Sequence, residues 1–200
     1  MQKQIQVKSS TPRGQEMIKQ FESTHSSYID VTRRTGWAVE VNFENIPAWM
    51  RNLQFGVWTA EPRENGKVNK APRHPNGGWG LGVNRPEQWA TFAQVQKAYS
   101  SGKFDGIGVL LTRDTEVVGV DIDDWRSLVS THTKVFETLI EFIQNGGYVE
   151  TSPSGAGLRA FVQGSLSGSG RKKGGLEIYD DVRFLTVTGH RREVLDVNTI

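Results

Sequence analysis

The chain has 200 residues and a formal net charge of +2, and 36% of its residues are hydrophobic. This composition is enough for one well-packed domain or one domain of two lobes, so it excludes disorder as the default state. The small net charge excludes strong attraction of nucleic acid by the molecule as a whole, so any nucleic-acid site must come from local basic clusters.

The absence of cysteine excludes a disulfide framework, a cysteine-ligated zinc site and a thiol nucleophile. The sequence has no apolar start typical of a signal peptide, and no run approaches the ~20 apolar residues that span a bilayer. We therefore expect a soluble, cytoplasmic protein with no membrane partner.

The N-terminal half begins with a polar extension, residues 1–44, of unknown role, with one expected helix after Thr11 and Pro12. Stronger signals start at Asn45. The expected elements are a short helix over 46–52, a strand over 54–60, a hairpin turn at 64–67, a loop over 70–82 and a helix that begins near Pro86 with Asn84 as its cap.

The C-terminal half contains more strand-like runs than helical ones. The expected elements are strands over 106–111 and 117–123 joined by a polar turn, an amphipathic helix over 125–144, strands over 148–151 and 157–162, and a hairpin-like pair of strands within 176–188. This order predicts an α+β fold with a largely antiparallel sheet.

The most informative stretch is Val118-Gly119-Val120-Asp121-Ile122-Asp123-Asp124. Strand side chains alternate between faces, so Asp121 and Asp123 point the same way, opposite to the apolar residues between them. Like charges at this separation repel unless a cation neutralises them, and hard oxygen ligands without cysteine favour Mg²⁺ or Mn²⁺. The alternative is a strand that ends in an acidic, solvated turn, with Asp124 as the cap of the next helix.

A third carboxylate, Glu177, lies between the apolar residues Leu176 and Ile178. If its strand lies beside the strand of Asp121 and Asp123, three carboxylates converge. Such a cluster can hold two metal ions that promote in-line displacement at a phosphate. The alternative for Glu177 alone is an ordinary half-exposed strand residue.

The stretch Thr151-Ser152-Pro153-Ser154-Gly155-Ala156-Gly157-Leu158-Arg159 is rich in small residues. Hydroxyl residues and glycines leave backbone N–H groups accessible, which suits the cradling of a phosphate, and Arg159 adds a planar, permanently charged fork. A plain hairpin loop favours the same residue types and is the alternative.

Two basic loops complete the candidate residues. Arg171, Lys172 and Lys173 stand between glycines, and Lys70 and Arg73 belong to a proline-containing loop. The loop of Arg171, Lys172 and Lys173 is suited to contact a nucleic-acid backbone, although such runs are commonly solvated surface.

Three of these motifs together resemble the bifunctional primase-polymerase domain of the archaeo-eukaryotic primase superfamily, found in phages, plasmids and other mobile elements. The matching motifs are Val118–Asp123, Ser152–Arg159 and Leu176–Tyr179, the last followed by Arg183-Phe184-Leu185-Thr186-Val187-Thr188-Gly189. The strand around Phe55 and the loop at Lys70 resemble the same family, so the likeness covers about residues 45–189.

The resemblance implies a two-lobed catalytic domain over residues 45–200, with an N-terminal lobe over 45–105 and an RRM-like lobe with the metal site over 106–200. It implies template-directed DNA synthesis with Mg²⁺ or Mn²⁺ held by Asp121, Asp123 and Glu177. The implied nucleotide-binding residues are Ser152, Ser154, Gly155, Gly157, Arg159, Lys70, Arg183 and Thr188, and the implied DNA-binding residues are Arg171, Lys172, Lys173 and Arg73. Many relatives carry histidine where this chain has Arg159, which removes a near-neutral proton carrier.

The implied partners are a single-stranded DNA template, a primer, deoxynucleotides or ribonucleotides, and a helicase or helical C-terminal module in cis or in trans. We expect the protein to act in the cytoplasm of a bacterial host or phage-infected cell, and its stop soon after Gly189 suggests a shortened form or one that needs a partner. Two alternatives are a metal-dependent nuclease and a non-catalytic RRM-like module that stacks bases on Tyr179 and Phe161.

Overall fold

The computed structural model describes residues 38–64, 67–77, 80–123, 137, 141, 145–173 and 175–192. The helix expected after Thr11 and Pro12 lies outside the described residues. Of the helix expected over 125–144, the structure describes Glu137 and Glu141, and both are helical. None of the helices among the described residues is long and apolar enough to cross a membrane.

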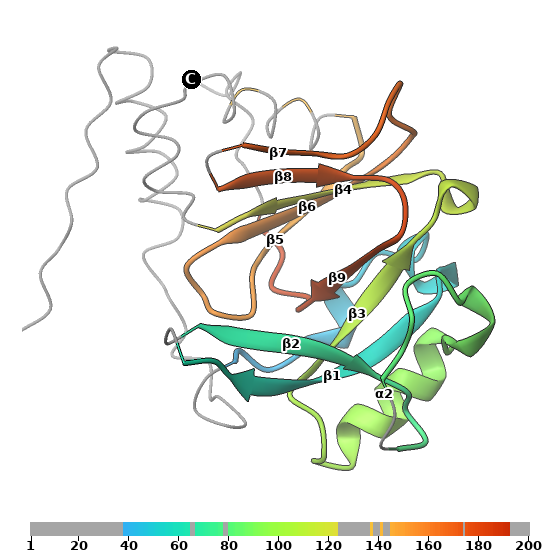
Figure 1. Ribbon diagram of the computed structural model, residues 1–200, viewed down its shortest axis with the longest axis vertical. Helices are drawn as coiled ribbons and strands as arrows, with labels where there is room; N and C mark the ends of the chain where they lie inside the picture. The colour runs from blue at the N-terminus through green and yellow to red at the C-terminus, as the bar shows by residue number, and fades with distance from the viewer. Residues whose placement is uncertain are drawn as a thin grey trace, which may run out of the picture.

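The first sheet has four antiparallel strands in the order β2-β1-β3-β9 (Figure 1). Its strands are β1 (Phe55–Pro62), β2 (Val68–Arg73), β3 (Gly106–Leu111) and β9 (Arg183–Val187). β2 is an edge strand, which explains why it tolerates Pro72, a residue without a backbone N–H.

The second sheet has five antiparallel strands in the order β5-β6-β4-β8-β7. Its strands are β4 (Val117–Ile122), β5 (Tyr148–Thr151), β6 (Leu158–Gln163), β7 (Arg171–Lys173) and β8 (Leu176–Tyr179). β4, the strand with the paired aspartates, lies at the centre of this sheet (Figure 1). The α+β pattern with antiparallel sheets is as expected.

In the part of the chain that the structure describes, short helices precede or connect these strands. They are α2 (Phe92–Ser100) and the 3₁₀ turns η1 (Phe43–Asn45), η2 (Met50–Asn52), η3 (Pro86–Gln88) and η4 (Arg113–Thr115). The cap expected at Asn84 is wrong. Thr91 caps α2 instead, in a capping box with Gln94, because Ala90 is still extended and bridges Phe55 of β1.

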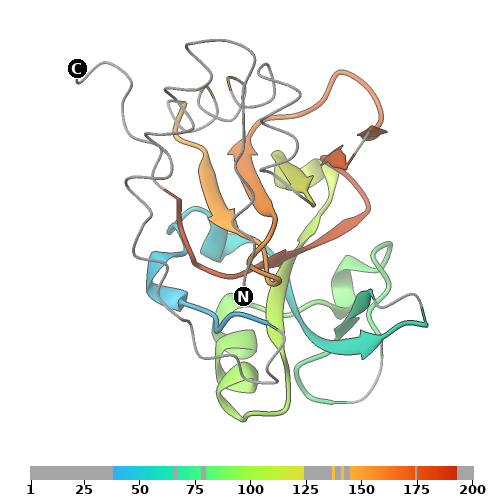
Figure 2. The same ribbon diagram turned by 90° about the vertical axis from the view of Figure 1, so that its left-hand side faces the viewer.

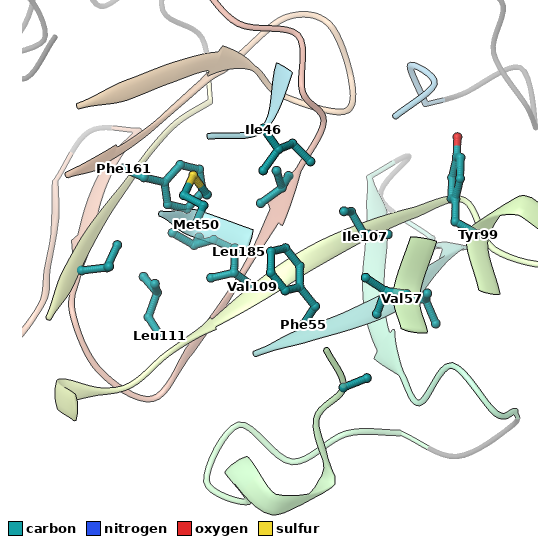
Figure 3. Packing of buried hydrophobic residues seen from close by; sticks show 14 of the residues in the cluster. Ile46, Met50, Phe55, Val57, Tyr99, Ile107, Val109, Leu111, Phe161 and Leu185 are labelled. Carbon is teal, nitrogen blue, oxygen red and sulfur yellow. The ribbon is translucent and has the colours of Figure 1, made fainter. Parts of the chain in front are cut away.

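One hydrophobic core joins the two sheets. Figure 3 shows how Phe55, Ile107 and Val109 of the first sheet and Phe161 of the second contribute to a single buried cluster. α2 adds Val95 and Tyr99 to the same cluster. β3 and β9, from the second part of the chain, join β1 in the first sheet.

The hairpin-like pair expected within 176–188 is wrong, and the strands over 106–111 and 117–122, which are consecutive in the sequence, also lie in different sheets. β3 and β4 are in different sheets, because the connection between them is the 3₁₀ turn η4 ending at Glu116 with φ 47°, and not a hairpin turn. β8 and β9 are also in different sheets, because the chain turns at Val182, with φ 45°, and passes from one sheet to the other (Figures 1 and 2).

Candidate functional site

The two aspartates lie at the end of β4, on the face that packs toward the first sheet. Val117 shares this face and belongs to the common core, and a side chain at Gly119 would collide with Leu185 of β9. The same face then continues to Asp121 and Asp123, of which Asp121 is partly buried and Asp123 exposed. The acidic pair therefore lies near the junction of the two sheets.

Strand register brings the third carboxylate beside the pair. Glu177 of β8 lies directly opposite Asp121, and the Asp123 N–H continues this ladder by donating to the Gly175 carbonyl at 3.1 Å. The condition for the three carboxylates to converge, that the strand of Glu177 lies beside the strand of the aspartates, is met.

On its other side Asp121 faces Arg159 of β6. The two residues are register partners, and Arg159 Nη2 donates to Asp121 Oδ2 at 2.9 Å. Arg159 is only 3% exposed, and its Nη1 donates to the Thr186 carbonyl at 3.4 Å. Its Nε is among the buried polar atoms without a hydrogen bond. In this arrangement Arg159 neutralises Asp121 and offers little surface to a phosphate, so its expected role in triphosphate binding stays a prediction.

Glu177 is surrounded by cations. Lys172 of β7 forms an ion pair with Oε1, Arg183 Nη2 lies 2.6 Å from Oε2, and the Tyr179 hydroxyl donates to Oε2 at 3.1 Å. Burial would raise the pKa of Glu177, but the hydrogen bonds from Lys172 and Tyr179 and the charge of Arg183 hold that pKa below its ordinary value. Glu177 is therefore ionised and compensated at neutral pH.

The fit of a divalent cation depends on these pairings. Among the described residues, no three histidine or carboxylate side chains gather closely enough to form a metal-binding group. The donor set nevertheless suits Mg²⁺ or Mn²⁺, because Asp121 and Asp123 share one face and Glu177 lies opposite Asp121 by register. A cation bound at Oε1 of Glu177 would meet the ammonium of Lys172, which forms an ion pair with that oxygen.

The loop Ser152–Gly157 lies against the same end of β4. A side chain at Gly157 would collide with the Ile122 carbonyl oxygen, and would come within 3.0 Å of the Asp123 carbonyl oxygen. Gly157 thus permits a close approach of the loop to the acidic residues. Ser152 Oγ accepts from the Gly157 N–H at 3.1 Å and lies 3.1 Å from Ser154 Oγ.

Two features limit the loop as a phosphate cradle. The Gly155 N–H donates to the Ser152 carbonyl at 2.9 Å, so both glycine N–H groups that sequence reasoning assigned to phosphate are used inside the loop. Ser152 is buried and Ser154 is exposed. The groups best able to meet a phosphate here are therefore side chains, with the Ser154 hydroxyl first among them.

Lys70 reaches the site from β2 of the first sheet. Its ammonium is within electrostatic range of Asp121, Asp123 and Arg159. Burial and the charge of Arg159 lower the pKa of Lys70, while the two aspartates oppose that shift. The other basic residue of β2 assigned from the sequence, Arg73, forms an ion pair with Glu61 of β1.

Sequence reasoning missed Glu150 of β5, which is fully buried behind the site. Its carboxylate accepts hydrogen bonds from the N–H groups of Thr188 and Gly189 at 2.8 to 3.0 Å and from the Tyr148 hydroxyl at 2.9 Å. Burial raises the pKa of Glu150 to about 7, against the opposing effect of these donors. Thr188, predicted to bind nucleotide, is 1% exposed and donates from Oγ1 to the Thr151 carbonyl, so its present role is structural. The sequence signal that could have revealed Glu150 is a glutamate within a run of strand-forming residues.

The expected mobile basic loop is the short edge strand β7. Arg171 lies opposite Ile178 and Lys172 opposite Glu177, and both basic side chains are exposed. The strand was missed because three polar residues between glycines carry no alternating pattern. Lys173 pairs with Leu176 in the register. β7 thus forms a basic edge beside the carboxylates.

The chain was compared with known proteins. No protein-family model matches it. It is 29% identical, over 161 residues, to a protein described as a DNA primase-polymerase from Nitratiruptor phage NrS-1. The match covers 76% of this chain and 21% of the phage protein, so the chain spans about a fifth of the length of the curated relative it matches.

Proposed function

We propose that this chain is the catalytic part of a DNA primase-polymerase, a nucleotidyltransferase that extends a strand along a DNA template. The observation on which this rests is the gathering of Asp121 and Asp123 with Glu177, Lys70 and the Ser152–Gly157 loop at one end of β4. The similarity to a phage DNA primase-polymerase supports this choice among the reactions that paired carboxylates serve.

The carboxylates are proposed to bind the divalent cations. Asp121 and Asp123 hold Mg²⁺ or Mn²⁺, and Glu177 contributes when it leaves its ion pair. Bound in this way, two cations would polarise the nucleotide phosphates and lower the pKa of a primer 3′-hydroxyl. Arg159 keeps Asp121 in place through its hydrogen bond of 2.9 Å, so the protein's own residues orient the first ligand before any cation arrives.

The nucleotide is proposed to lie between β2 and the loop before β6. Lys70 meets the triphosphate as a point charge and the Ser154 hydroxyl donates to it, while Ser152, Gly155 and Gly157 give the loop its shape. Arg183 lies beside Glu177 and is 40% exposed at its side chain, so it can contact a phosphate or the nucleotide sugar. Arg159 and Thr188 act from behind the site, because both are buried.

The template and primer are proposed to lie along the basic edge. Arg171, Lys172 and Lys173 of β7, with Arg73 of β2, would contact the DNA backbone. The proposed substrates are deoxynucleotides or ribonucleotides, and a helicase or helical module is proposed as a partner, either in a longer chain or as a separate protein. The RRM-like character expected for residues 106–200 belongs to the same proposal.

Two observations weigh against a non-catalytic RNA-binding module. Phe161 is 0% exposed and part of the core, so it cannot stack on a base. The ring of Tyr179 lies beneath the guanidinium of Arg183, 4.2 Å from the ring centroid, and its hydroxyl is bonded to Glu177. The aromatic residues that this alternative requires already have structural partners.

Primer extension tests the proposal. The protein is mixed with a labelled primer on a single-stranded template, deoxynucleotides and Mg²⁺ or Mn²⁺, beside Asp123→Asn and the matched control Asp114→Asn on η4. We expect extension by the wild type and by Asp114→Asn, and none by Asp123→Asn. Shortening of the DNA without added nucleotides would identify a nuclease instead, and neither extension nor shortening in either metal would reject the proposal for this chain.

A further inference from the structure

The two oxygens of Glu177 are held in different ways. Oε2 accepts from the Tyr179 hydroxyl at 3.1 Å and from Arg183 Nη2 at 2.6 Å. Among the described residues, Oε1 has a hydrogen bond from the Lys172 ammonium only. One oxygen is therefore fixed by two groups, and the other depends on a single lysine.

The two cations that pair with Glu177 also differ in how firmly they are placed. The Arg183 guanidinium lies on the ring of Tyr179, at 4.2 Å from its centroid, and its planar fork is anchored on two sides. The Lys172 side chain is 66% exposed, whereas the Glu177 side chain is 8% exposed. Because most of the Lys172 side chain is in solvent, its ammonium regains hydration when it leaves, while Arg183 and Tyr179 still compensate and orient the buried carboxylate.

Lys172 also lies in the field of the acidic pair. Its hydrogen bond and charge interaction with Glu177 raise its pKa most, and Asp123 raises it further. The ammonium is thus attracted both by Glu177 and by an aspartate that has no ion pair with a lysine or arginine among the described residues. This is the neighbourhood in which a divalent cation shared by the carboxylates would be held.

We propose that Lys172 is an exchangeable counter-ion: its ammonium holds Oε1 of Glu177 until a nucleic-acid phosphate binds that lysine, which frees Oε1 for a divalent cation. The inference rests on the proposed function and adds a coupling to it. Because coupling is reciprocal, template binding strengthens metal binding and metal binding strengthens template binding. Lys172 is in this sense a positioning residue that readies the third carboxylate only when DNA is present.

Metal binding without catalysis tests the coupling. Free Mn²⁺ is measured by electron paramagnetic resonance with the full chain, with and without a short single-stranded oligonucleotide, after subtraction of the Mn²⁺ bound by the oligonucleotide alone. For the wild type we expect the oligonucleotide to tighten Mn²⁺ binding by about threefold or more. For Lys172→Gln we expect Mn²⁺ binding about threefold to tenfold tighter than wild type without the oligonucleotide, and little further change when it is added.

Two variants separate the ion pair from a general effect of charge. Arg171→Gln removes one positive charge from the neighbouring position of β7, whose side chain points to the opposite face, so its Mn²⁺ affinity without DNA should stay within about twofold of wild type. Lys172→Arg keeps the charge and should keep the coupling. The inference would be overturned if Lys172→Gln and Arg171→Gln had equal Mn²⁺ affinities. It would also be overturned if the oligonucleotide did not change the Mn²⁺ affinity of the wild type.

Primer extension in the same buffer separates this inference from the function on which it rests. If the wild type extends the primer but its Mn²⁺ affinity does not change with DNA, the proposed role of Lys172 is rejected and the proposed polymerase function stands. A wild type that neither binds Mn²⁺ nor extends a primer rejects both. The wild-type comparison needs no variant, so the inference can be overturned even if a substitution disturbs folding.

Discussion

Asp121 and Arg159 face each other across β4 and β6, with Asp121 Oδ2 accepting from Arg159 Nη2 at 2.9 Å, and their side chains are 16% and 4% exposed. Burial of two charges costs solvation free energy that their attraction only partly returns, so such a pair adds little net stability. Loss of one partner is different, because it leaves a buried charge without compensation. Replacement of only one partner of this ion pair should therefore lower the free energy of unfolding.

The two aspartates should differ in their effect on stability. Asp121→Asn leaves Arg159 with a buried, uncompensated charge and should lower the free energy of unfolding by about 3 kcal/mol. Asp123→Asn changes an exposed side chain and should alter it by less than about 0.5 kcal/mol. Urea unfolding of both variants checks this, and both should lose primer extension. Equal free energies of unfolding of the two variants would show that the buried charge of Arg159 does not need Asp121 for its compensation.

Replacement of Arg159 should change the metal requirement more than the nucleotide requirement. In Arg159→Met the guanidinium no longer holds Asp121, so we expect the Mn²⁺ concentration for half-maximal extension to rise about tenfold or more. KM for the deoxynucleotide, measured at saturating Mn²⁺, should change less. The reverse result, a raised nucleotide KM with an unchanged metal requirement, would favour the direct phosphate contact expected from the sequence.

A methyl group at Gly157 should disturb the loop beside the aspartates. Gly157→Ala places a Cβ against the Ile122 carbonyl oxygen and 2.9 Å from Ser152 Oγ, so the loop must move away from β4. We expect primer extension at low nucleotide concentration to fall about tenfold, because small displacements of positioning groups cost rate. Gly168→Ala is the matched control, since a Cβ there meets open space. Similar activities of the two variants would remove the loop from the site.

The buried Glu150 should make stability depend on pH. Its pKa is raised by burial from an ordinary value of 4.5 to about 7, so the folded protein holds the proton more tightly than the unfolded chain does. The resulting stabilisation is fully present below about pH 4.5 and is lost as the pH rises through about 7.

Comparison with Glu150→Gln isolates this effect. The difference in free energy of unfolding between wild type and variant should shift by roughly 1 to 3 kcal/mol across that range, to the disadvantage of the wild type at higher pH. Urea unfolding at several pH values measures it, and the contribution of other groups cancels in the difference. Parallel pH profiles for the two proteins would mean that Glu150 does not titrate there.

Several elements were predictable because they depend on local pattern. β3 has the bounds expected from the sequence, residues 106–111, and β4 ends one residue before the expected limit. The common face of Asp121 and Asp123 also follows from the two-residue period of a strand. The strand of Glu177 was expected only conditionally beside them, and the register confirmed it.

The charge balance of the site was not predictable in the same way. From the sequence, repulsion between Asp121 and Asp123 was the dominant interaction. In the structure Asp121 is paired with Arg159, which is 38 residues away along the chain, and Glu177 is paired with Lys172 on a strand that the sequence did not reveal. The hairpin-like pair expected within 176–188 was not predictable either, because its two strands, β8 and β9, join different sheets.

The sequence by itself determined which side chains of one strand lie together on one face. Only the tertiary structure decided which strands are neighbours, and with that which cation neutralises which carboxylate. The physical reason is that side-chain alternation is a property of a few consecutive residues, whereas an ion pair depends on the register between strands that the shared core brings together.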